Sequence, residues 1–177
     1  MNLLKRIPGW QQIAPVYAVI VVMLYTWSLV LFFWRLPSFL YYSTLGEAAV
    51  IFSYMVVVDL LESLLVLFIL LAIAFILPQK WFYNKFVTIG SSLVILSLAW
   101  LMFSNEIFVT QVFSLKQLLQ KGLIVGLPIL VITCAIVRIK PLDRFVSEFS
   151  NRCVIFLYIW GVLDVLAVLT VLVRNVF

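Results

Sequence analysis

The stretch AAVIFSYMVVVDLLESLLVLFILLAIAFIL runs from Ala48 to Leu77, stops at Pro78 and decides the fold of this chain. A helix needs about 20 consecutive apolar residues to cross the hydrocarbon core of a bilayer, and this stretch is longer than that. Its only charged residues are Asp59 and Glu62. We therefore predict that a helix over residues 48–77 spans a membrane.

The composition of the whole chain agrees with a lipid environment. Of its 177 residues, 66% are hydrophobic and only 11% are charged, against about 45–50% and about 25% in soluble domains. A water-soluble fold of this composition would lack the polar side chains needed to cover its surface. We predict an all-α, polytopic transmembrane helical bundle, in which residues 1–177 form a single integral membrane domain.

Four further apolar segments bring the expected number of spans to about five. The first follows Pro15 and is expected to end at Arg35 and Pro37, and its apolar length favours an uncleaved anchor over a removable signal peptide. The fourth is the shortest, so a full crossing and a re-entrant segment both remain open. The four segments lie near residues 16–34, 86–103, 123–137 and 153–173.

Basic residues between the spans predict the orientation. With the N-terminus inside, eight Lys and Arg residues fall on cytoplasmic segments and four on outer segments, as the positive-inside rule favours. We therefore expect a multi-pass protein of the cell membrane with a cytoplasmic N-terminus and an outer C-terminus. A re-entrant fourth segment would reverse the position of the C-terminus. The inner residues are Lys5, Arg6, Lys80, Lys85, Arg138, Lys140, Arg144 and Arg152, and the outer ones Arg35, Lys116, Lys121 and Arg174.

Two connecting segments have the periodicity of amphipathic helices. Between Glu106 and Lys121, apolar residues recur at helical spacing, which predicts a helix lying in the outer interface. Between Pro141 and Arg152 the same pattern predicts an inner interfacial helix. Both helices can simply rest on lipid. Alternatively, the inner one contributes to a cytoplasmic docking face formed by Arg138, Lys140, Arg144 and Arg152.

Acids within the spans are the most informative residues of the sequence. A charged carboxylate at the centre of a bilayer costs about 2.5–3.5 kcal/mol or more, so such groups usually face a protein interior or water. Asp59 and Glu62 are three residues apart and share one helical face. Structural ion pairs with outer basic residues are one interpretation, and a proton or cation pathway is another. For Asp164, the simplest role is a hydrogen bond to Ser, Thr or Tyr across helices. The candidate basic partners are Arg35, Lys121 and Arg174.

Glycines indicate where helices can approach one another closely. Gly122 and Gly126 form a G-x-x-x-G step at the start of the fourth span, and Gly90 stands beside serines in the third. We favour packing within the chain, and association with another chain is the alternative.

Missing residue types exclude several classes of chemistry. The chain has no histidine and only two cysteines, which excludes Cys/His metal sites and every His-dependent catalytic mechanism. A divalent metal on Asp59 and Glu62 would need further acids from the loops, which offer few. We expect no metal, no cofactor and no nucleic-acid partner, because the net charge of +5 is explained by membrane topology.

The sequence thus predicts a non-catalytic integral membrane subunit or scaffold that assembles with itself or with another protein in the bilayer. An ion channel or proton-coupled transport protein that uses Asp59, Glu62 and Asp164 is the alternative, and a membrane enzyme is the least favoured class.

Overall fold

A computed structural model describes residues 9–76, 85–108 and 115–176, and gives only the backbone of residues 76, 105–108, 115–121 and 123. The described chain is helical apart from short connections and contains no strand. This confirms the predicted all-α bundle. The helices are α1 (Trp10–Tyr42), α2 (Leu45–Ile76), α4 (Phe86–Phe108), α5 (Leu115–Arg138) and α6 (Lys140–Val176).

Four of these helices, α1, α2, α4 and α6, are long and apolar enough to cross a membrane. Within a helix every interior backbone N–H and C=O group is hydrogen-bonded, which is what the hydrocarbon core demands. The protein is therefore a multi-pass membrane protein. The apolar part of α5, Ile124–Arg138, is shorter, so its full crossing stays a prediction.

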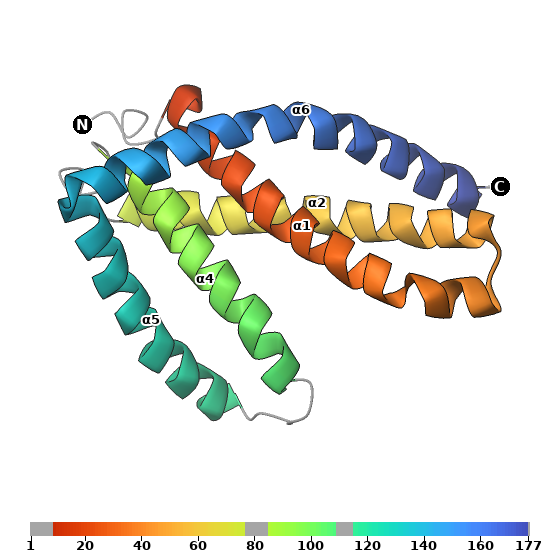
Figure 1. Cartoon of the computed structure of the whole chain (residues 1–177), viewed down its shortest axis with the longest axis horizontal. Helices are drawn as coiled ribbons and strands as arrows, with labels where there is room; N and C mark the ends of the chain where they lie inside the picture. Colours follow the sequence, from red (N-terminus) through yellow and green to blue (C-terminus); the bar gives the residue numbers. More distant parts are fainter. Residues whose placement is uncertain (1–8, 77–84, 109–114, 177) are drawn as a thin grey trace.

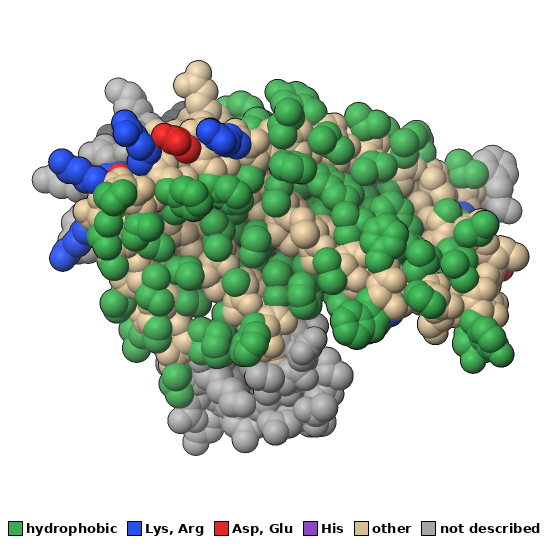
Figure 2. Space-filling view, viewed as in Figure 1, with side chains coloured by type: hydrophobic (Ala, Val, Ile, Leu, Met, Phe, Trp, Pro, Cys, Tyr) green, Lys and Arg blue, Asp and Glu red, His purple; other side chains and the backbone are tan. Residues whose placement is uncertain are grey.

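The helices are arranged as a group of three and a hairpin (Figure 1). Helices α1, α2 and α6 contact one another along the long axis, whereas α4 and α5 diverge from them as an antiparallel pair. The beginnings of α1, α4 and α6 and the ends of α2 and α5 gather at one end of the molecule. We call this the basic end, because Lys and Arg side chains gather there (Figure 2). The helix ends that meet there carry Lys85, Arg138, Lys140 and Arg144.

The best-buried apolar residues lie where α1 crosses α4 and α2. Val16 and Ile20 of α1 are fully buried in a cluster that includes Leu70 of α2 and Phe86 of α4. Gly90 allows this approach, because a Cβ atom there would lie only 3.2 Å from Val16 Cγ1. The close packing expected from Gly90 is therefore present between α1, α2 and α4.

Helix α1 is longer than predicted. It begins at Trp10, contains both Pro15 and Pro37, and ends at Tyr42, so the expected limit at Arg35 and Pro37 is wrong. A proline removes one hydrogen bond from a helix interior, but transmembrane helices tolerate it because local adjustments and neighbouring groups satisfy the freed carbonyl.

The turn after α1 is closed by a capping box at the start of α2. The Thr44 backbone N–H donates to Glu47 Oε2 at 2.8 Å, and the Glu47 N–H donates to Thr44 Oγ1 at 3.4 Å. These reciprocal bonds satisfy two groups that the helix itself cannot pair.

The two amphipathic segments are parts of longer helices. Residues 141–152 are helical as predicted, but they form the first turns of α6 and continue into its apolar segment without a break. No proline or glycine follows Pro141 until Gly161, so nothing in the sequence ends the helix earlier. Of the predicted outer helix, residues 106–108 end α4 and residues 115–121 begin α5, while 109–114 lie outside the described residues.

Candidate functional site

A hydrogen bond between tyrosine and aspartate joins α1 to α6 inside the group of three helices. The Tyr25 hydroxyl donates to Asp164 Oδ1 at 2.8 Å. The side chain of Tyr25 is only 1% exposed, and its ring packs on Trp160 with 4.6 Å between ring centroids. Asp164 thus makes the cross-helix bond to a hydroxyl group that the sequence predicts.

A second acid, Asp59 of α2, is hydrogen-bonded to α1. Ser28 Oγ donates to Asp59 Oδ1 at 2.6 Å, and Asp59 is 4% exposed. The other carboxylate oxygen, Oδ2, is buried and has no hydrogen-bond partner in the described part of the chain. Tyr25 and Ser28 are three residues apart on α1, so one helical face serves both acids. We call these four residues the acid–hydroxyl cluster: Tyr25, Ser28, Asp59 and Asp164.

The structure does not bring the predicted basic partners to these acids. Among the described side chains, no Lys or Arg nitrogen lies within ion-pair distance of Asp59, Glu62 or Asp164. Arg35 and Arg174 are exposed on α1 and α6, and the side chain of Lys121 lies outside the described residues. Hydroxyl groups, which carry no charge, therefore stabilise Asp59 and Asp164 in this bundle.

Glu62 differs from Asp59, although only three residues separate them. Its side chain is exposed in a groove of about 440 Å³ between α1, α2 and α4. The rest of the lining is apolar, and we call this cavity the Glu62 groove. Neither Asp59 nor Asp164 lines it. Its residues are Leu24, Trp27, Glu62, Leu65, Val66, Leu98, Leu101 and Met102.

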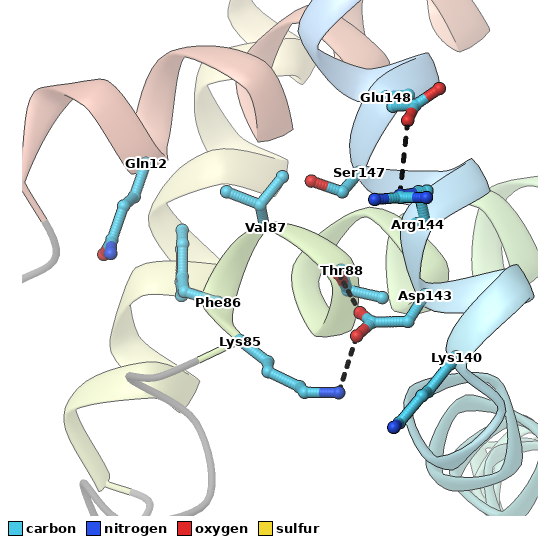
Figure 3. Close-up of a pocket in the computed structure, with 10 residues that line it drawn as sticks. All are labelled: Gln12, Lys85, Phe86, Val87, Thr88, Lys140, Asp143, Arg144, Ser147 and Glu148. Atoms are coloured by element: carbon cyan, nitrogen blue, oxygen red, sulfur yellow. Dashed lines mark hydrogen bonds and ion pairs between the residues drawn. The ribbon is translucent and has the colours of Figure 1, made fainter.

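A second cavity, of about 560 Å³, lies at the basic end, and most of the residues that line it carry polar side chains. Figure 3 shows Asp143 of α6 facing Lys85, which directly precedes α4, and Thr88 in the first turn of α4. Lys85 Nζ lies 2.6 Å from Asp143 Oδ2, and Thr88 Oγ1 donates to Oδ1 at 2.7 Å. Lys85 Nζ also donates to the Val137 carbonyl of α5 at 2.9 Å. We call this cavity the basic-end pocket, lined by Gln12, Lys85, Phe86, Val87, Thr88, Lys140, Asp143, Arg144, Ser147 and Glu148.

The sequence could not reveal the Lys85–Asp143 contact. Asp143 stands on the polar face of an amphipathic segment, and Lys85 has the position of a residue that anchors at lipid headgroups. The two residues are 58 positions apart, and no local pattern links them. Only the packing of α4 against α5 and α6 brings them together.

The Lys85–Asp143 pair makes the stability of the basic end depend on pH. Asp143 lies in the first turn of α6, before its apolar segment, and hydrogen bonds from Lys85 and then Thr88 lower the pKa of its carboxyl group. A carboxyl group whose pKa is lowered by folding stabilises the protein above its unfolded pKa of about 3.9 and loses this effect as the pH falls.

We therefore expect the thermal unfolding midpoint in mild detergent to fall more between pH 6 and pH 3 for the wild type than for Asp143→Asn. Glu148→Gln is the control, because the Arg144–Glu148 pair is exposed, spans 3.7 Å and should contribute little. Equal pH dependence of the wild type and Asp143→Asn would contradict the role of this pair.

The remaining predicted residues are the two glycines of α5 and the basic residues of the docking face. Among the described residues, no atom of a neighbouring element lies within 4 Å of a Cβ built on Gly122 or Gly126, so no close packing is seen at these two glycines. The residues of the predicted docking face are all exposed: Arg138, Lys140, Arg144 and Arg152. Within the described ranges, no cluster of three or more His, Cys, Asp or Glu side chains could hold a metal ion.

Comparisons of the chain with protein families, with functionally characterised proteins and with solved structures found no match in any of the three.

Proposed function

We propose that this chain is a non-catalytic integral membrane subunit that assembles with further copies of itself through the Glu62 groove. The observation that carries the proposal is an exposed acid on a membrane-spanning helix, surrounded by apolar side chains. Such an arrangement is costly when only lipid fills the groove.

The depth of Glu62 supports this proposal. It lies fourteen residues before Ile76 in α2, which is about 21 Å along the helix. The hydrocarbon core is about 30 Å thick, so Glu62 lies within it when α2 ends at the membrane surface. A helix that fills the groove and offers Glu62 a hydrogen-bond donor would remove the cost of the unpaired acid.

Helix α5 of a second copy can supply that donor. Lys121 directly precedes Gly122, and no atom of another described element lies within 4 Å of a Cβ built on Gly122 or Gly126. Lys121 lies seventeen residues before Arg138 in α5, which is about 26 Å along the helix. Measured along the helix from the basic end, this is similar to the distance of Glu62, and a lysine would complement its charge. The two surfaces differ, so the copies would associate head to tail, as in a ring.

Site-specific crosslinking in membranes tests the contact. A photo-crosslinking amino acid at Leu65, which lines the groove, is expected to link two differently tagged copies. The matched control is Ile155, which is similarly exposed on α6 but lies outside the groove. Lipid adducts alone at position 65, or equal crosslinking from both positions, would overturn the proposal.

A charge exchange tests the pairing of residues. We expect Glu62→Lys to abolish most crosslinking from position 65, because Lys121 would then meet a like charge. Combining it with Lys121→Glu should restore the crosslink, whereas Glu47→Lys, at the exposed α1–α2 turn, should leave it unchanged. Failure of the double variant to recover, with its helical content intact, would contradict the pairing.

Proton-coupled transport is the second candidate, and Asp59 favours it. This acid is buried in the acid–hydroxyl cluster with one carboxylate oxygen unpaired, as is typical of a group that binds and releases a proton. Proton flux into proteoliposomes, followed with a pH-sensitive dye, would be lost in Asp59→Asn and Asp164→Asn if the cluster carries protons. Absence of wild-type flux, with crosslinking retained, would favour the assembly subunit.

A further inference from the structure

We infer that the basic-end pocket binds the phosphate group of an anionic phospholipid, with Lys140 and Arg144 as the residues that hold it. This site is separate from the Glu62 groove, and its function does not depend on assembly. The inference rests on the charges that the pocket leaves uncompensated, on its polar lining and on its position in the fold.

The charges of the pocket favour an anion. Its lining contains three cations and two carboxylates. Lys85 and Thr88 already bind both oxygens of Asp143. Arg144 reaches Glu148 only through Nε, at 3.7 Å, so the remaining N–H groups of its guanidinium can donate elsewhere. Lys140 has no ion-pair partner in the described part of the chain. Figure 3 shows both basic side chains at the pocket, with no bond drawn to Lys140.

Polar groups around these cations suit phosphate oxygens. Ser147 can donate a hydroxyl hydrogen bond, and the side-chain amide of Gln12, which also lines the pocket, can donate through its Nε2 group. The first turn of α4 also lines the pocket, and the N-terminus of a helix attracts anions. An arginine with hydroxyl and amide donors is a common combination for phosphate recognition.

The position of the pocket points to a lipid as the source of the phosphate. It lies at the basic end, where α4 and α6 begin and their apolar segments follow, so it is placed at the level of the headgroups. Beside it on α6, Phe145 and Phe149 stack on each other and are exposed, together with Leu142. These side chains offer an apolar surface along which acyl chains can lie.

Native mass spectrometry of the detergent-purified protein tests the site. We expect phosphatidylglycerol to form adducts that phosphatidylcholine does not form at equal concentration. The double variant Lys140→Gln with Arg144→Gln should reduce the phosphatidylglycerol adduct about tenfold. The matched control is Arg138→Gln with Arg152→Gln, which removes the same charge from exposed residues that do not line the pocket.

Three further outcomes decide the inference. Glu148→Gln should strengthen adduct formation, because it frees Arg144. Equal losses in the two double variants would overturn the site in favour of diffuse surface charge. Displacement of the lipid by an equal concentration of inorganic phosphate would overturn the assignment to a lipid, because the phosphate alone would then account for binding.

Discussion

Replacing Tyr25 with alanine is expected to lower the free energy of unfolding by about 3–5 kcal/mol, which is typical of a large aromatic side chain removed from a packed interior. Tyr25 is 1% exposed, packs on Trp160 and donates to Asp164. The substitution therefore opens a cavity between α1 and α6 and leaves the half-buried Asp164 without its hydroxyl partner.

Two controls separate packing from hydrogen bonding at this position. Tyr25→Phe removes only the hydroxyl group and should cost about 0.6 kcal/mol, the average for hydrogen bonds within membrane proteins. Tyr158→Ala removes a tyrosine that is 75% exposed on α6 and should cost less than Tyr25→Ala. Unfolding by steric trapping in bicelles measures all three. A loss for Tyr25→Ala no larger than that for Tyr158→Ala would contradict the packing described here.

Replacing Gly90 with leucine is expected to be the second large effect, with a loss of about 1–3 kcal/mol or more from overpacking. A Cβ atom added to Gly90 would already lie 3.2–3.3 Å from side-chain carbons of Val16 and Leu70. Val16 is fully buried and cannot move aside. The added leucine carbons would therefore force α4 away from α1 and α2.

Gly161→Leu is the matched control for Gly90→Leu. No neighbouring atom lies within 4 Å of a Cβ built on Gly161 in α6, so the same substitution meets open space there. The steric-trapping assay should rank Gly90→Leu well below Gly161→Leu in stability. Equal stability of the two variants would mean that α4 does not approach α1 this closely.

The sequence predicts the membrane bundle well because lipid imposes a simple requirement. A helix that crosses the core must be apolar over a fixed length, so hydropathy alone locates α1, α2, α4 and α6. The limits of α1 were harder to predict. A proline commonly ends or kinks a helix in soluble proteins. Here the helix continues past Pro37 to Tyr42, because transmembrane helices tolerate proline.

The candidate site could be predicted only in part. Acids stand out in an apolar stretch because their burial is costly, which identified Asp59, Glu62 and Asp164. Their surroundings depend on how helices pack, and a spacing of three residues places two side chains on one face without deciding which of them is covered. In the structure Asp59 is buried against Ser28, and Glu62 is exposed in a groove. The sequence predicted that Asp164 bonds a Ser, Thr or Tyr hydroxyl group, but only the fold identifies Tyr25 as that partner.

Counting subunits in single vesicles tests self-assembly most directly. Fluorescently labelled wild-type protein, reconstituted at high lipid dilution, should bleach in two or more steps in most occupied vesicles. Glu62→Lys should bleach in one step, and its combination with Lys121→Glu should recover the wild-type pattern. Single-step bleaching of the wild type at every protein-to-lipid ratio would contradict assembly through the Glu62 groove.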